Sequence, residues 1–505
     1  MAACISSSTT ANRFLLRQIL RDEWGFDGFV VSDWDSIRQL QIHGLTEDDR
    51  ESACVAANAG VDMEMAGDAY SHHLQGLVEE GAVSEDLIDT AVLRILRIKF
   101  ELGLFENPYT DPGQLPDVGG DQILAAARKS ALQGCVLLKN NDATLPLAEK
   151  ALASLAIIGP LADAPYEQLG TWIFDGDESL SVTPLQAIRE LVGDDVELRY
   201  VRAMENSRSR VNDEFDVAVE AASASDAVLL FLGEESILSG EAHSRANIDL
   251  PGDQVELVRR IRAAGKPVVA IILAGRPLTL SNVVDEVDAI LYAWHPGTLG
   301  GPAIADLLFG REVPSGKLPV TFPRLVGQIP IYYSQKNGGK PPSHDNVVHI
   351  DEIDTFAPQT SLGMSAFHLD TCFTPLFPFG HGLSYTRFEY HNLRVSDAEI
   401  PLGATITIST ELTNSGDREA EEVAQLYTRD LVGSITRPVK ELKGFQRVRL
   451  QPGETTTVSF TLHTDDLSFS DRYGRRIVEP GLFHAWIDGT SDTEHRVEFR
   501  IVATP

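Results

Sequence analysis

An acidic side chain follows a short apolar run near the beginning of the chain. The run is residues 29–31, it is preceded by Gly28, and it leads into Ser32, Asp33 and Trp34. Such a run is typical of a buried parallel strand, and the carboxyl ends of these strands carry the catalytic groups of a β/α barrel. The Trp34 ring would offer a flat apolar face to a sugar, whereas an Asp in this place can also cap the next helix. The local pattern indicates either a catalytic carboxylate at Asp33 or a helix cap.

A second carboxyl group could come from any of four glutamates, Glu64, Glu234, Glu235 and Glu241. A pair of catalytic carboxyl groups needs one ionised and one protonated member, so their environments must differ. Glu64 lies near the end of a predicted strand at residues 60–65, a legitimate catalytic position in a barrel. Glu234 and Glu235 follow the apolar run 227–232, at the edge where open α/β sheets bind ligands. Either of these two could also be a helix cap or a solvated loop charge.

Glu241 lies farther out, in the loop at residues 239–245. Gly240 frees the backbone before it, and Arg245 could position a carboxylate, contact a substrate or be merely solvated. Asp33 and Glu241 fall in different predicted domains, so a site that uses both must form at a domain interface, a usual place for ligand clefts.

Aromatic side chains interrupt another loop, where Trp172 and Phe174 could line a site or fill the domain core. The acidic residues within 175–178 could hold calcium, but Ca²⁺ needs about six or more oxygen ligands, and a solvated acidic loop is the better interpretation. His295 and His381 lack a partner at metal-ligand spacing and are expected to be structural. No motif in the chain calls for a metal ion or a cofactor.

Three early stretches, residues 11–16, 20–28 and 30–34, resemble glycoside hydrolase family 3, in particular its periplasmic β-glucosidase-like branch. The resemblance continues through residues 137–140, 275–278 and 314–319 and covers nearly all of the chain.

The resemblance implies a role for each candidate. Asp33, in a Ser-Asp-Trp motif, matches the family's nucleophile, and the segment around Glu241 resembles its acid/base loop, whereas Glu64 falls in a structural motif. The implied activity is hydrolysis of terminal β-D-glucosyl residues by double displacement, with the two carboxyl groups about 5–5.5 Å apart. The implied substrate is a β-glucoside or a small β-linked oligosaccharide. A β-xylosidase is the nearest alternative, and the β-N-acetylglucosaminidase branch fits less well because it commonly lacks a glutamate from the second domain.

The predicted fold is multidomain, α/β followed by β. Residues 1–112 alternate strands with helices at 47–59, 72–80 and 84–102, as in a parallel sheet. The family resemblance implies that they form the last part of a (β/α)₈ barrel. Residues 120–335 would form an α/β sandwich, with strands at 155–158, 227–232, 268–273 and 289–293 and helices at 215–224, 253–264 and 300–309. Residues 336–385 would form a linker or binding loop. Residues 386–505 alternate polar and apolar side chains and would form a β-sandwich, which the resemblance identifies as fibronectin type III-like.

Composition restricts the partners. The 505 residues include 42 basic and 74 acidic side chains, a formal net charge of −32, which argues against nucleic acid or an anionic membrane as partner. No apolar run is long enough to span a membrane. The first residues lack the features of a signal peptide, although the resemblance implies a periplasmic or secreted enzyme. An oligomer is compatible with the sequence.

A complete barrel needs roughly 250 residues, more than twice what precedes the second predicted domain. We therefore expect a barrel fragment in a truncated chain, which on its own would be poorly active or insoluble. The competing function is a non-catalytic remnant that binds sugar weakly or has only a structural role.

Overall fold

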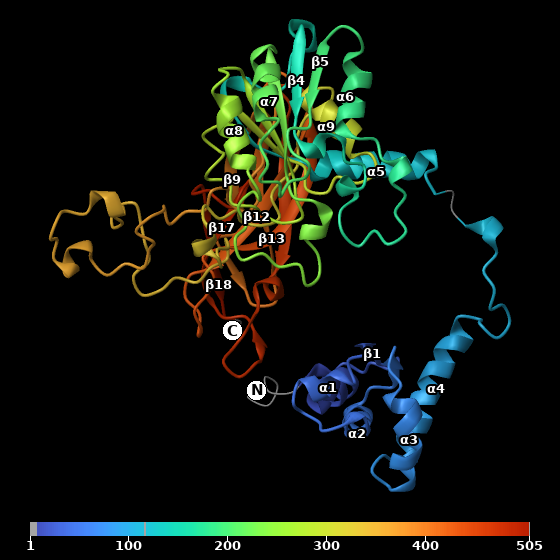
Figure 1. Cartoon of the computed structure of the whole chain (residues 1–505). Helices are drawn as coiled ribbons and strands as arrows, with labels where there is room; N and C mark the ends of the chain where they lie inside the picture. The colour runs from blue at the N-terminus through green and yellow to red at the C-terminus, as the bar shows by residue number, and fades with distance from the viewer. Residues whose placement is uncertain (1–7, 116–117, 504–505) are drawn as a thin grey trace. The chain divides into compact units, whose positions relative to one another are not determined.

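The computed structural model describes residues 8–115 and 118–503 and divides into two compact units at Asp117 (Figure 1). In the first unit, helices alternate with two short strands. Their order is a π-helix at Phe14–Glu23, β1 at Val31–Trp34, α1 at Gln39–Ile42, α2 at Asp49–Ala59, β2 at Met63–Met65, α3 at Ala69–Glu79 and α4 at Glu85–Glu101. β1 and β2 are parallel, with Val31 opposite Met63. The predicted alternation of strand and helix is therefore confirmed.

The first strand begins later than the sequence predicts, so Asp33 lies within β1 rather than after its end. The Asp62 carboxylate accepts the Val30 N–H at 2.8 Å and pairs with Arg21 at 2.7 Å and Arg94 at 2.9 Å. The Val30 N–H is thus bound by a side chain, whereas the Val30 carbonyl accepts the backbone N–H of Met63 at 3.0 Å, and the paired residues begin with Val31 opposite Met63.

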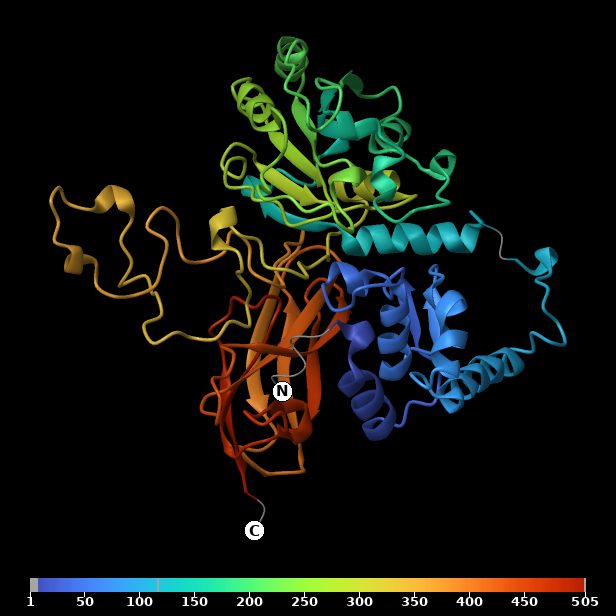
Figure 2. The ribbon, with the colours of Figure 1, turned by 60° about the horizontal axis from the view of Figure 1, so that its bottom comes forward.

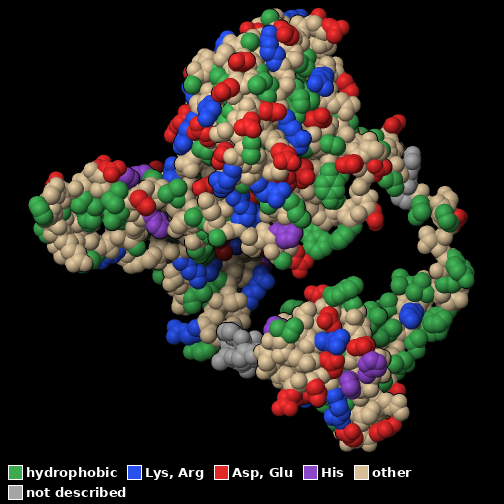
Figure 3. Space-filling view, in the orientation of Figure 1, with side chains coloured by type: hydrophobic (Ala, Val, Ile, Leu, Met, Phe, Trp, Pro, Cys, Tyr) green, Lys and Arg blue, Asp and Glu red, His purple; other side chains and the backbone are tan. Residues whose placement is uncertain are grey.

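The prediction that this strand is buried is wrong. Three of the four residues of β1 are exposed, among them Val31 at 40%, and Met63 of β2 is 43% exposed. The 17-residue helix α4 buries no side chain, and apolar side chains gather along it (Figure 3). The small core of the unit instead lies under α2 and α3 and includes Ala53, Ala56 and Leu77.

The first part of the second unit is a six-stranded sheet in the order β3-β8-β7-β6-β4-β5. All its strand pairs are parallel except β3 with β8. The strands are β3 at Val136–Asn140, β4 at Ser154–Ile158, β5 at Glu197–Val201, β6 at Ala227–Gly233, β7 at Val268–Leu273 and β8 at Ala289–Tyr292. The apolar runs of β4, β6, β7 and β8 are buried throughout, as expected for parallel strands covered on both faces.

Helices cover both faces of this sheet, as the predicted α/β sandwich requires (Figure 1). α7 at Phe215–Ser223 and α8 at Gln254–Arg262 pack on one face. α6 at Pro184–Val192 and α9 at Gly300–Leu308 pack on the other, next to α5 at Asp121–Gly134.

The last part of the chain is a β-sandwich, drawn in orange to red in Figure 2. One sheet has the order β10-β18-β17-β12-β13 and the other β14-β11-β9. Its long strands are β9 at Phe388–Val395, β11 at Thr405–Asn414, β12 at Ala420–Asp430, β13 at Glu441–Leu450, β14 at Thr455–His463, β17 at Gly481–Asp488 and β18 at Val497–Val502, with the short strand β10 at Glu399–Pro401. The predicted fold class, α/β followed by a β-sandwich, is confirmed.

Residues 336–385 connect the α/β part to the β-sandwich. They contain only two short helical turns, at Ile350–Glu352 and Gln359–Leu362. The α/β part and the sandwich also meet through a buried ion pair, in which the Lys317 ammonium lies 3.0 Å from the Glu422 carboxylate. Among the described residues, no helix is both long and apolar enough to cross a membrane.

Candidate active site

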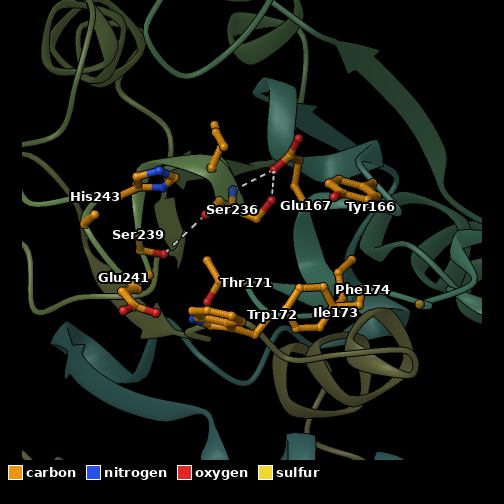
Figure 4. A pocket seen from close by; sticks show the side chains of 15 residues that line it. Tyr166, Glu167, Thr171, Trp172, Ile173, Phe174, Ser236, Ser239, Glu241 and His243 are labelled. Atoms are coloured by element: carbon orange, nitrogen blue, oxygen red, sulfur yellow. Dashed lines mark hydrogen bonds between the residues drawn. The ribbon is translucent and has the colours of Figure 1, made fainter. Parts of the chain in front are cut away.

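Two loops of the second unit enclose a hollow of about 650 Å³ (Figure 4). One loop follows β4 and contributes residues 166–176, and the other follows β6 and contributes residues 236–243. β4 and β6 are neighbouring parallel strands, so both loops leave the same edge of the sheet. The hollow thus lies at the carboxyl ends of the strands, where open α/β sheets bind ligands.

Glu241 lies on the rim of this hollow with its side chain exposed. Within residues 8–115 and 118–503, no hydrogen bond or ion pair engages its carboxyl group. The backbone on either side is in the left-handed region, with φ of 104° at Gly240 and 62° at Ala242. Few residues adopt such angles without support from their surroundings, so this geometry presents Glu241 in a defined place.

The other three glutamates have structural partners. Glu234 is fully buried and pairs with two arginines. Glu235 accepts the Ser207 N–H at 3.0 Å. Glu64 accepts the backbone N–H of Ala69 at 3.2 Å and of Tyr70 at 2.7 Å, at the start of α3. Of the four candidates, Glu241 alone has a carboxyl group without a partner in the described part of the chain.

Trp172 and Phe174 line the hollow and do not belong to the core. Their exposed fractions are 61% and 83%, and their rings lie in edge-to-face contact with centroids 5.3 Å apart. Figure 4 shows both rings on the same side of the hollow, with Trp172 next to Glu241. An exposed indole beside a free carboxyl group can pack against the face of a sugar ring.

Arg245 does not have the position expected of a substrate-binding or Glu241-positioning residue. Its guanidinium pairs with Glu234 and donates to the Asp249 carbonyl at 2.9 Å. Among the described residues it lies outside the lining of the hollow. Two side chains four residues apart, such as those of Glu241 and Arg245, lie next to each other on a helix, but this segment is a loop.

Asp33 and Trp34 are exposed on the first unit, Trp34 at 69%. The Asp33 carboxylate accepts the N–H of Trp34 at 2.6 Å, and the Asp33 carbonyl accepts the Ser32 hydroxyl at 2.9 Å. The buried Ser32 also accepts the Met65 N–H from β2 at 2.9 Å. Pairing with β2 therefore fixes the backbone next to Asp33, while its carboxylate faces outward.

The sequence did not single out several polar residues of the hollow: Tyr166, Glu167, Thr171, Ser236, Ser239 and His243. Glu167 accepts the Ser236 N–H at 2.6 Å and so joins the two loops. The only sequence feature that could have indicated these residues is that one loop follows the predicted strand β4 and the other follows β6.

His295 supports the hollow from within the protein. Its Nε2 lies 3.3 Å from the Ser239 hydroxyl. Gly170 and Gly275 lie so close to the ring that a Cβ on either would fall within 3.0 Å of it. Burial lowers the pKa of His295 to about 4. His381 is half-buried, desolvation lowers its pKa, and its Nε2 lies 2.9 Å from the Leu138 carbonyl.

We expect acid to weaken the fold partly through His295. Between its ordinary pKa of 6.5 and the folded value of about 4, the unfolded chain binds a proton that the folded chain does not. The free energy of unfolding should therefore decrease as the pH falls through this window, by at most about 1.4 kcal/mol per pH unit from this group. Urea unfolding across the window measures the slope. In His295→Gln the slope should be shallower but not zero, because other groups with lowered pKa values, among them His381 and His484, also contribute, and an unchanged slope would contradict the assignment.

Residues 8–115 and 118–503 contain no cluster of three or more His, Cys, Asp or Glu side chains that could hold a metal ion. Asp177, once a candidate calcium ligand, accepts the backbone N–H of Ser179 at 2.9 Å and its hydroxyl at 2.6 Å. These hydrogen bonds lower the pKa of Asp177. The acidic side chains are spread over the surface of both units (Figure 3).

The first unit and the two parts of the second unit correspond to known domain families. Residues 1–98 match the glycosyl hydrolase family 3 N-terminal domain, residues 135–385 the glycosyl hydrolase family 3 C-terminal domain, and residues 422–491 a fibronectin type III-like domain. The chain belongs to glycoside hydrolase family 3.

Several characterised proteins are similar along nearly the whole chain. The periplasmic beta-glucosidase of Salmonella typhimurium is 38% identical over 95% of this chain and 64% of its own length, and a beta-xylosidase of Formosa agariphila is 35% identical over 96% and 66%. The crystal structure of a beta-glucosidase from Listeria innocua in complex with glucose superposes with a TM-score of 0.89 at 36% identity, covering 98% of this chain and 66% of that one. A mutant of the same enzyme has been solved with laminaribiose. The chain thus spans about two thirds of the length of these relatives.

Proposed function

We propose that this chain carries both catalytic carboxyl groups of a retaining exo-β-glycosidase, with Asp33 as the nucleophile and Glu241 as the general acid/base. The observation that carries the proposal is the contrast among the glutamates. Glu64, Glu234 and Glu235 have structural partners, whereas Glu241 stands free beside exposed aromatic rings.

The proposed reaction has two displacements at the anomeric carbon. In the first, the Asp33 carboxylate forms a bond to this carbon as the bond to the leaving oxygen breaks, and Glu241 gives its proton to that oxygen. In the second, Glu241 takes a proton from water, whose oxygen displaces the Asp33 carboxylate. The sugar leaves with its original configuration, and both carboxyl groups return to their starting protonation states.

The proposed substrate is a terminal β-D-glucosyl residue. β-Glucosidases among the relatives, one of them solved with glucose, support this choice. The similar beta-xylosidase supports a β-xyloside as the alternative. Glucose and xylose differ by a hydroxymethyl group, and an aromatic face can accept either ring.

The experiment that tests the substrate class compares initial rates of the purified chain on aryl β-glucoside and aryl β-xyloside under identical conditions. The proposal predicts a higher kcat/KM for the glucoside and a β-configured first product, which NMR of the anomeric proton detects. A preference for the xyloside would favour the alternative, and an α-configured first product would exclude retention.

A non-catalytic sugar-binding or structural role is the second candidate. The observation that favours it is the exposure of the two parallel strands of the first unit. In that case the chain would bind glucose or laminaribiose in calorimetry without releasing product from any aryl glycoside.

We expect Trp172→Ala to weaken substrate binding. Loss of the exposed indole face should raise KM for an aryl β-glucoside roughly tenfold, equivalent to about 1.4 kcal/mol, with a smaller effect on kcat. Trp172→Phe, which keeps an aromatic face, is the matched control and should retain most of the affinity. Steady-state kinetics measure both variants, and an unchanged KM in Trp172→Ala would remove this residue from the site.

A further inference from the structure

We propose that Glu234, Arg276 and Arg245 form a clamp that positions Glu241, and that Arg276 is its central positioning residue. The inference rests on the proposed role of Glu241 and assigns a task to charged side chains that do not line the hollow themselves.

The clamp is built on Glu234, the first residue after β6. Its side chain is fully buried, and its N–H donates to the Leu273 carbonyl of β7 at 2.8 Å, so the sheet fixes its backbone. One carboxylate oxygen accepts Arg245 Nη1, and the other accepts Arg276 Nε at 3.0 Å. A buried carboxylate needs such compensation, so the two guanidinium groups are tied to this point.

Arg276 holds both ends of the segment that carries Glu241. Its Nη2 donates to the carbonyl of Leu238 on one side of Glu241 and to the carbonyl of His243, at 2.9 Å, on the other. The planar guanidinium therefore bridges the two ends of a six-residue segment while its Nε remains bound to Glu234. A lysine ammonium is a point charge without this fork geometry and cannot reproduce all three contacts at once.

Arg245 fixes the next part of the same loop. While Nη1 is bound to Glu234, Nη2 donates to the Asp249 carbonyl at 2.9 Å. The backbone N–H of Thr279 donates to the Ile248 carbonyl at 3.0 Å. The loop is thus attached at Leu238, His243 and Asp249, and two of these attachments lead back to Glu234 through Arg276.

The backbone that the clamp encloses needs support. Gly240 and Ala242 both have positive φ, and Ala242 is an ordinary residue in a region that non-glycine residues seldom occupy. Such conformations persist where the surroundings over-determine them. The exposed side chains of residues 240–244 contribute little packing, so the hydrogen bonds from Arg276 are the main restraint on where Glu241 points.

The first test is amide hydrogen exchange on the full chain, read peptide by peptide, in Arg276→Lys and Glu234→Gln. We expect amides of residues 237–244 to exchange at least about tenfold faster in both variants, since local opening is governed by the lost restraints. The strands β6 and β7 should be unchanged. Arg260→Lys, which alters a surface pair with Glu256, is the matched control and should leave residues 237–244 unaffected.

The second test distinguishes positioning from a general structural role. Protonation by Glu241 matters most when the leaving group is poor, so Arg276→Lys should lose kcat/KM on phenyl β-glucoside by about 10-fold or more relative to 2,4-dinitrophenyl β-glucoside. A purely structural defect would lower kcat/KM on both substrates by the same factor.

Unchanged exchange at residues 237–244 would overturn the clamp, as would faster exchange spread over the whole second unit. An unchanged ratio between the two substrates, in a variant whose loop opens, would overturn the link to Glu241. If the unmodified chain hydrolyses neither substrate, the proposed function fails, and the exchange measurement still decides whether the clamp holds the loop.

Discussion

Asp33→Asn should lower kcat/KM for an aryl β-glucoside on the order of 10⁴-fold or more, because an amide cannot form the covalent glycosyl intermediate. The substitution keeps the size of the side chain and its exposed setting within β1. Folding should therefore be unaffected, and thermal unfolding of the variant should superpose on that of the unmodified chain. The loss of kcat/KM is measured relative to the unmodified chain, so the prediction does not depend on the absolute rate of that chain.

Asp35→Asn is the matched control for this prediction. Asp35 lies two residues farther on, with φ of 54°, a conformation that asparagine tolerates as well as aspartate. The activity of Asp35→Asn should be close to that of the unmodified chain. Comparable losses in both variants, or full activity in Asp33→Asn, would exclude Asp33 as the nucleophile.

Glu241→Gln should produce a loss that depends on the leaving group. Without an acid, kcat/KM for substrates with poor leaving groups should fall by about 10²–10⁴-fold, whereas 2,4-dinitrophenyl β-glucoside should be nearly unaffected in the first displacement. The second displacement lacks its base, so a burst of dinitrophenol followed by slow turnover is expected in stopped-flow measurements.

Added azide should restore turnover of Glu241→Ala, since this nucleophile needs no base, and the product should be the β-glucosyl azide. Glu190→Gln, on the exposed face of α6, is the matched control and should behave as the unmodified chain. An equal loss on all substrates, or an α-configured azide, would contradict the assignment of Glu241.

Sequence patterns predicted the central sheet because its strands are continuous apolar runs. The bounds of β6, β7 and β8 agree with the predictions to within one residue, as do the starts of α7, α8 and α9. β5 carries Glu197 and Arg199 and lies at the edge of the sheet, where strands do not need a continuous apolar run. β3 ends in Lys139 and Asn140 and pairs antiparallel with β8, and neither strand was predicted.

Local sequence features pointed to some residues of the candidate site. Two aromatic residues in one loop and a glutamate after a glycine in another lie around the hollow, although the sequence left open whether the aromatic rings fill the core. The partner of Arg245 could not be predicted, because spacing along a loop does not determine which carboxylate a guanidinium reaches. The burial of Glu234 depends on the neighbouring strand β7 and on Arg276, 42 residues away along the chain, and no local pattern reports it.

The most direct test of the two-carboxylate account is peptide mapping of Glu241→Gln after exposure to 2,4-dinitrophenyl β-glucoside. The activated leaving group allows the first displacement without an acid, and the missing base slows the second, so a glucosyl group should accumulate on Asp33. The double variant with Asp33→Asn should carry none. A glucosyl group on any other carboxylate, or none on Asp33, would contradict the account.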